Sequence, residues 1–184
     1  VPEVDAVLGT TSYGDILKAI REAMEGKHFQ EFKDIDYLPE KLGKRVLTTG
    51  GHFGYLKIAE GCDKHCTYCI IPKLRGKFRS VPMERLVTQA KEMAEEGVKE
   101  LILVAQETTV YGTDIYGKKS LHILLKELCK IKGIRWIRVL YCYPEEIYDE
   151  LIQTMKEEKK ICHYLDLPIQ HASDRILKRM GRRT

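Results

Sequence analysis

The apolar residues from position 54 onward follow two alternating patterns. Short aliphatic runs such as residues 101–105 (LILVA) are typical of strands that are covered on both faces. Between them lie longer stretches with apolar residues three or four positions apart, opened by Pro or Ser and closed by Gly. We expect strands at 55–60, 101–105, 134–141 and 164–169, and helices at 82–96, 120–129, 144–156 and 173–180. This alternation predicts βαβ units and a parallel sheet.

The first fifty residues have a different pattern. Residues 4–9 predict a short strand, and residues 14–25 predict a helix, with apolar residues at helical spacing at Ile16, Leu17, Ile20 and Met24. The polar stretch that follows is rich in Gly. We therefore expect three parts: the end of an amino-terminal domain at 1–26, a linker at 27–52, and the first part of a barrel domain at 53–184.

Four βα units in sequence fit half of a TIM-like (β/α) barrel or half of a doubly wound sheet, and periodicity alone does not separate the two. In a parallel barrel the chemistry lies in the loops after the carboxyl ends of the strands. A cysteine-rich loop at 61–69, Gln106 with Glu107, and Gln170 with His171 all follow expected strands. We therefore expect an α/β fold, a truncated TIM-like barrel preceded by the tail of another α/β domain.

Composition narrows the class of protein only a little. The net charge is +4, from 31 basic and 27 acidic residues, which is weak support for a nucleic-acid partner. No run of about 18 apolar residues predicts a membrane span, and no secretion signal opens the chain, so we expect a cytoplasmic protein without a membrane partner. Six cysteines in such a chain favour metal binding or catalysis over disulfides.

Three of these cysteines form a C-x3-C-x2-C motif, at Cys62, Cys66 and Cys69. Iron–sulfur clusters commonly take four cysteine ligands. Three thiolates would leave one iron of a 4Fe-4S cluster open, as a catalytic zinc site leaves one position open. An open iron can bind a small molecule through an amine and a carboxylate, and S-adenosylmethionine (SAM) bound there could be cleaved by one electron to a hydrogen-abstracting radical.

A second interpretation is a structural zinc site with His65 or His52 as its fourth ligand, which would make the chain a zinc-stabilised nucleic-acid-binding module. Zinc motifs usually carry a second pair of ligands, such as CxxC or HxxxH, and the sequence shows none. The position of the motif, after a predicted strand and before βαβ units, favours the cluster.

Beyond the cysteines, three segments carry a resemblance to a known family: GCDKHCTYCIIPKLRGKFRSVP, LILVAQETTVYGTDIYG and LDLPIQHASDRILKRMGR. From about residue 53 to 183 the chain resembles the radical SAM methylthiotransferases, and within them the RimO branch. The resemblance implies a transferase that inserts a methylthio group at the β-carbon of an aspartate in ribosomal protein S-twelve of the small subunit. The alternative within the family is a tRNA methylthiotransferase of the MiaB type.

The resemblance also implies cofactors and partners. In that family a second 4Fe-4S cluster, held by three cysteines of the amino-terminal domain, carries the sulfur to be inserted. One SAM methylates that sulfur, a second is cleaved to the radical, and an electron donor such as flavodoxin or ferredoxin supplies the electron. Residues 1–52 contain no cysteine, so the ligands of the second cluster are expected before Val1.

Five further residues are candidates for binding the cofactor. By the resemblance, Tyr68 lies against the adenine, although it could equally be a packing tyrosine. Gln106 and Glu107 would accept hydrogen bonds from the methionine amine, or simply be a polar pair that ends a strand. Gln170 and Ser173 would face cofactor or substrate, or Ser173 would cap its helix. No side chain is assigned as a catalytic acid, base or nucleophile.

Overall fold

A parallel sheet of four strands forms the centre of the computed structural model, which describes residues 3–38 and 46–182. The strand order is β3-β6-β7-β8, and every neighbouring pair is parallel. The strands are β3 (Phe53–Lys57), β6 (Glu100–Val104), β7 (Trp136–Val139) and β8 (Ile161–Leu165), and the helices between them are α3 (Met83–Glu95), α5 (Leu121–Cys129) and α6 (Asp149–Glu157). The predicted βαβ alternation is confirmed.

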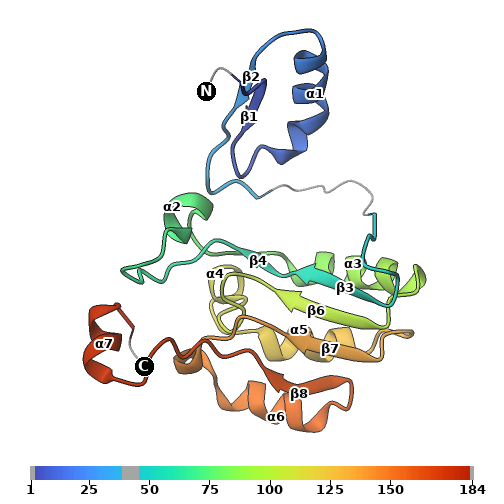
Figure 1. The fold of residues 1–184 in the computed structure, drawn as a ribbon. Coiled ribbons are helices and arrows are strands. Elements are labelled where there is room, and N and C mark those ends of the chain that lie inside the picture. The colour runs from blue at the N-terminus through green and yellow to red at the C-terminus, as the bar shows by residue number, and fades with distance from the viewer. Residues whose placement is uncertain (1–2, 39–45, 183–184) are drawn as a thin grey trace.

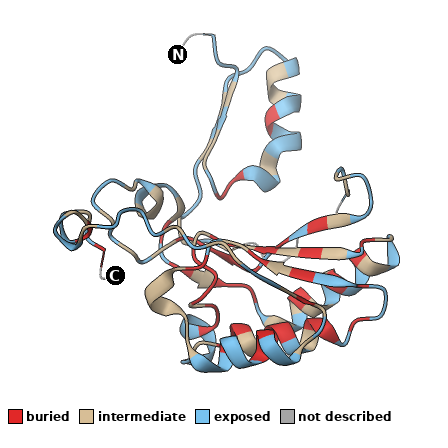
Figure 2. Ribbon diagram, turned by 60° about the horizontal axis from the view of Figure 1, so that its bottom comes forward, coloured by how far each residue is buried: buried red, intermediate tan, exposed pale blue. Residues whose placement is uncertain are grey.

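The helices pack on one face of this sheet (Figure 2). Side chains alternate along each strand, so Leu56, Leu103 and Val139 are buried beneath the helices. On the other face Tyr55 is 42% and Trp136 is 53% exposed. Helices on one face distinguish a partial TIM-like barrel, whose open face would become the barrel interior, from a doubly wound sheet. The expectation that residues 101–105 are covered on both faces is therefore wrong for this chain.

Shorter elements gather beyond the carboxyl ends of the strands, on the left of Figure 1. Among them, β4 pairs antiparallel with β5. These elements are β4 (Ala59–Glu60), α2 (Ile71–Arg75), β5 (Arg79–Ser80), α4 (Thr113–Tyr116), the 3-10 turn η2 (Pro144–Glu146) and α7 (Asp174–Arg179). None of the helices in the described parts of the chain is long and apolar enough to cross a bilayer.

The last strand differs from its prediction. It was expected at 164–169 from the apolar residues there, but β8 begins at Ile161 and ends at Leu165. Its neighbour β7 ends at Val139, which pairs with Leu165, so β7 offers no residue with which β8 could pair beyond Leu165. Pro168, which has no N–H to donate, follows. Residues 166–169 consequently form part of a loop at the same end of the sheet as the cysteine motif.

The amino-terminal residues form a separate small unit (Figure 1). It consists of β1 (Ala6–Leu8), the turn η1 (Tyr13–Asp15), α1 (Ile16–Met24) and β2 (Phe29–Glu31), which pairs parallel with β1. Strand β2 lies inside the range expected as a linker. The predicted helix is confirmed, but its apolar face is uncovered: Ile16, Leu17, Ile20 and Met24 are 47–84% exposed.

The amino-terminal unit and the residues directly after it contact the segment that follows the cysteine motif. The Asp36 carboxylate accepts hydrogen bonds from the Lys77 amide at 2.8 Å and from the Arg79 guanidinium at 3.0 Å. The Thr10 hydroxyl donates to the Leu74 carbonyl at 2.8 Å. These bonds connect the unit to the barrel part through side chains close to the candidate site.

The stability of the barrel part depends on the apolar layer between sheet and helices. Leu103 lies in β6, is fully buried, and packs in the main core. We expect Leu103→Ala to lower the free energy of unfolding by about 2–5 kcal/mol, because it removes buried methyl groups and leaves a cavity. Urea unfolding followed by circular dichroism measures this. Ile152→Ala, at a residue that is 46% exposed on α6, is the control and should cost much less.

Candidate active site

The cysteine motif lies on a loop that begins at Gly61, directly after β4. The Cys62 amide donates to the Gly76 carbonyl at 3.2 Å, and the Cys69 amide donates to the Cys66 carbonyl at 3.0 Å, which closes a turn. All three thiols are free and half-buried. The loop therefore presents three accessible sulfur atoms on a short, hydrogen-bonded segment.

The three thiols are near enough to influence one another electrostatically. Burial raises the pKa of the Cys62 thiol, and the negative charges of Glu107, Cys66 and Cys69 raise it further. Bound metal cations would offset both effects, because a coordinating thiolate keeps its negative charge beside positive iron. This donor set fits an iron–sulfur cluster.

A cavity of about 380 Å³ opens beside the loop. Two of the predicted site residues, Cys62 and Glu107, line it. The other lining residues come from the same loop, from the segments that follow β6 and β7, and from single residues before β5 and after α7: Asp63, Lys64, His65, Phe78, Val110, Thr113, Tyr143, Glu145, Glu146 and Gly181. The structure thus brings the first cysteine and the end of β6 into one cavity, as the loop positions in the sequence predicted.

Glu107 is 2% exposed. Its Oε1 accepts hydrogen bonds from the amide of Thr109, at 3.1 Å, and from the Thr109 hydroxyl. Its Oε2 is buried and has no hydrogen-bond partner among the described residues. Burial raises the pKa of this carboxyl. A buried carboxylate oxygen without a partner is costly, so an ammonium group that entered the cavity would relieve a penalty already present.

Gln106, which lies beside Glu107 in the loop after β6, contacts a different group. Its Nε2 donates to Glu60 Oε1 at 3.1 Å. Glu60 also pairs with Lys57, and Arg75 lies 3.7 Å away. Gln106 is not among the described residues that line the cavity. It steadies the carboxylate immediately before the cysteine loop.

The other three candidate cofactor-binding residues are Tyr68, which lies in the cysteine loop, and Gln170 and Ser173, which follow β8; none of them, nor Cys66 or Cys69, is among the described residues that line the cavity. Tyr68 is 52% exposed. Gln170 is exposed and has a positive φ of 63°. Ser173 occupies the cap position of α7 without a capping side-chain hydrogen bond, and its amide donates to His171 Nδ1 at 2.9 Å.

Sequence reasoning missed the residues that follow β7. The Tyr143 hydroxyl lies 3.2 Å from the Cys66 sulfur. Lys64, inside the cysteine loop, forms an ion pair with Glu146, which Lys119 also contacts at 2.9 Å. A signal was available, because these residues follow a barrel strand at its carboxyl end, as Glu107 does.

Helix α7 packs against the cysteine loop. The Thr67 amide donates to the Met180 carbonyl at 3.0 Å, and the Thr67 hydroxyl donates to the Arg179 carbonyl at 3.2 Å. The side chain of Arg182 is 2% exposed and donates to the Pro168 carbonyl at 2.9 Å. The end of the described chain therefore holds the middle of the cysteine motif in place.

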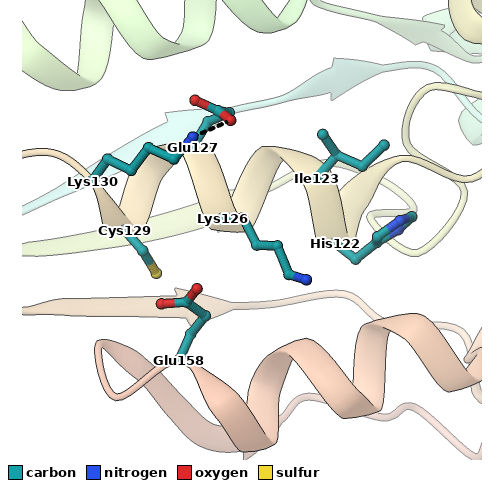
Figure 3. A pocket seen from close by; sticks show the side chains of 7 residues that line it. All are labelled: His122, Ile123, Lys126, Glu127, Cys129, Lys130 and Glu158. Atoms are coloured by element: carbon teal, nitrogen blue, oxygen red, sulfur yellow. Dashed lines mark hydrogen bonds and ion pairs between the residues drawn. The ribbon is translucent and has the colours of Figure 1, made fainter.

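A second cavity, of about 470 Å³, lies on the outer side between α5 and α6 (Figure 3). Its lining is mainly charged, and none of the predicted site residues belongs to it. Cys129 points towards Glu158 there (Figure 3), and burial raises the pKa of this thiol to about 11. Cys129 therefore stays protonated and packs as a small apolar side chain, as does the fully buried Cys142.

A single metal ion needs ligands that converge on one point. Among the residues that the structure describes, no three His, Cys, Asp or Glu side chains are grouped in this way. The thiolates of a cubane cluster have a different requirement, because each binds a different iron atom. The spread of three thiols along one loop is compatible with that arrangement.

The partial barrel and a three-cysteine loop at its carboxyl-terminal edge define the radical SAM class. The sequence pattern of the Radical SAM superfamily matches residues 56–184, and the chain belongs to this superfamily. Two solved structures of the radical SAM methyltransferase TsrM from Kitasatospora setae align with TM-scores of 0.57 and 0.56 at 16% and 14% identity. They cover 73% and 72% of this chain, and the match spans 26% of each. At this identity they support the fold alone.

Curated relatives are much more similar. The chain is 68% identical, over its whole length, to a protein of Lachnoclostridium phytofermentans named ribosomal protein uS12 methylthiotransferase RimO. Proteins with the same name from Clostridium botulinum and Clostridioides difficile are 57% and 52% identical, again over the whole chain. The chain spans 42%, 42% and 41% of these relatives, respectively.

Proposed function

We propose that this chain is part of a methylthiotransferase that modifies the β-carbon of an aspartate in ribosomal protein uS12. The observation that carries the proposal is the identity of 68% over the whole chain to a relative with that name, in a chain whose three thiols lie at the expected edge of the barrel. The same comparisons favour uS12 over tRNA as the substrate. They also favour an enzyme over a zinc-stabilised nucleic-acid-binding module.

The residues of the site have separable tasks in this proposal. Cys62, Cys66 and Cys69 would hold a 4Fe-4S cluster with one open iron. When bound, the cluster and SAM together supply one-electron chemistry that can remove hydrogen from an unactivated carbon. Glu107 offers its unpartnered Oε2 to the amino group of the SAM methionine. We propose that Tyr68, Gln106, Gln170 and Ser173 contribute to the surroundings of SAM or substrate.

The role of Glu107 can be tested by binding alone. We expect Glu107→Gln to weaken SAM binding to the reconstituted protein by about 10- to 100-fold, because a hydrogen bond to a charged group contributes ~1.5–3 kcal/mol. Isothermal titration calorimetry under anaerobic conditions measures this affinity. Glu92→Gln, at an exposed position of α3, is the matched control. Unchanged SAM affinity in Glu107→Gln would remove this residue from the site.

The substrate is tested by mass spectrometry in the source organism. In a strain that lacks the gene for this protein, the uS12 peptide that contains the target aspartate should be lighter by the mass of a methylthio group minus that of the hydrogen it replaces. Complementation should restore it, and complementation with a Cys66→Ala variant should not. Unmodified tRNA with fully modified uS12 in the deletion strain would instead assign the protein to tRNA.

Further parts of the proposal concern the whole protein. Residues 1–26 would end an amino-terminal domain, 27–52 would connect it to the barrel, and 53–184 would form the first part of the barrel domain. The ligands of a second 4Fe-4S cluster would lie before Val1. The partners would be the small ribosomal subunit and an electron donor such as flavodoxin or ferredoxin, in the cytoplasm.

A further inference from the structure

The hydroxyl of Tyr143 reaches a cysteine sulfur from outside the cysteine motif. Its Oη lies 3.2 Å from Cys66 Sγ, although the two residues are 77 positions apart in the sequence. The backbone of Tyr143 is fixed as well, since its amide donates to the Thr109 hydroxyl oxygen at 3.0 Å. Thr109 is in turn bonded to the buried Glu107. The contact with Cys66 is therefore part of a connected network.

Two cations hold the aromatic ring of Tyr143. The guanidinium carbon of Arg182 lies 3.7 Å from the ring centroid, and the Lys64 ammonium lies 4.7 Å from it. Both cations are fixed by other contacts, Arg182 by the Pro168 carbonyl and Lys64 by Glu146. Cations close to the ring attract its electron density, which makes the hydroxyl a stronger hydrogen-bond donor.

The direction of the hydrogen bond follows from the chemistry of a ligated cysteine. A thiolate bound to iron has no proton and can only accept, so the tyrosine hydroxyl must donate. Hydrogen bonds to the cysteine sulfurs are one of the factors that set the reduction potential of an iron–sulfur cluster. The reduced cluster carries one more negative charge, so a donor at the sulfur stabilises the reduced state more than the oxidised one.

We propose that Tyr143 is a positioning residue for the cluster. Its hydroxyl holds the Cys66 sulfur by a hydrogen bond and raises the reduction potential of the cluster. The inference rests on the proposed 4Fe-4S cluster. It goes further than that proposal because a residue outside the cysteine motif would help to set how readily the cluster accepts an electron.

The test compares the reduction potential of wild-type protein and Tyr143→Phe, after anaerobic reconstitution of the 184-residue chain with iron and sulfide. Phenylalanine keeps the ring and both cation contacts and removes only the hydroxyl. We expect equal iron and sulfide content in the two proteins. At a fixed applied potential, the ratio of reduced to oxidised cluster should fall about tenfold in the variant, a shift of ~59 mV for one electron. Redox titration followed by electron paramagnetic resonance measures this ratio.

A second measurement reports on the bond itself. The iron–cysteine stretching bands in the resonance Raman spectrum should shift when the wild-type protein is moved into deuterated water, and the shift should be smaller in Tyr143→Phe. Tyr13→Phe, which removes the hydroxyl of a tyrosine that is 48% exposed in the amino-terminal unit, is the matched control and should behave as wild type.

The outcomes separate this inference from the proposed function. Wild-type protein that takes up no iron–sulfur cluster would overturn the proposed function. Clusters in both proteins with the same potential and the same bands would overturn the role of Tyr143 alone. Should Tyr143→Phe fail to fold or to take up iron, absence of the Raman isotope shift in the wild-type protein would still overturn the role of Tyr143, because it would contradict a hydrogen bond at the Cys66 sulfur.

Discussion

Cys66→Ala is expected to abolish the iron–sulfur chromophore after anaerobic reconstitution. The reason is that only three protein thiolates would hold the cluster. One iron already lacks a protein ligand, and alanine at position 66 would leave a second iron without one. Iron and acid-labile sulfide per chain should both fall close to zero, whereas the far-ultraviolet circular dichroism should change little because Cys66 is half-buried in a loop. Iron analysis and visible absorption measure the effect.

The control for this substitution is another half-buried thiol. Cys162 lies in β8, outside the motif, and Cys162→Ala should bind as much iron as the wild type. Wild-type iron content in Cys66→Ala, or loss of the cluster in Cys162→Ala, would contradict the assignment of the ligands.

Gly61→Ala is the second substitution with a large expected effect. Gly61 has a φ of 79°, a conformation that costs a residue with a Cβ about 1–3 kcal/mol. A Cβ there would also collide with the backbone carbonyl oxygens of Lys77 and Gly76, the second at 2.7 Å. We expect the free energy of unfolding to fall by about 3 kcal/mol or more, and iron uptake to fall with it because the loop that carries Cys62 is displaced.

A second glycine with a similar positive φ, but with free space around it, separates the conformational cost from the cost of the collision. Gly117 has a φ of 70°, and a Cβ there would meet no atom within 4 Å. Gly117→Ala should therefore cost only the conformational part and should leave iron uptake unchanged. Urea unfolding and iron analysis of both variants test this, and equal losses in the two would show that the close approach at Gly61 has no importance.

Much of the barrel part could be predicted because its signals are local. The helix and strand alternation, and the position of the cysteine motif after a strand, follow from periodicity and from Pro, Ser and Gly at the boundaries. The placement of β8 was wrong because the apolar residues 164–169 resemble a strand, while the length of β7 decides where pairing ends. Strand β2 was missed because three residues, two of them polar, give no periodic signal.

The candidate site was predicted only in part for a similar reason. The sequence indicated Gln106 and Glu107 together, but of the two only Glu107 lines the cavity, because the loop after β6 directs Gln106 to Glu60. Tyr143 reaches Cys66, and Arg182 reaches the ring of Tyr143, across long separations in the sequence. Such contacts depend on how the strand ends and α7 are arranged in space, which no local pattern specifies.

The three thiolates would leave one iron of the cluster free to bind SAM. Electron–nuclear double resonance of the reduced cluster, with SAM carrying nitrogen-15 in its amino group, measures whether SAM binds to that iron. We expect a strong coupling between the cluster spin and that nitrogen, present in the wild type and lost in Cys66→Ala together with the cluster. A reduced cluster whose spectrum is unchanged by labelled SAM, or a protein that holds a single zinc ion in place of a cluster, would contradict it.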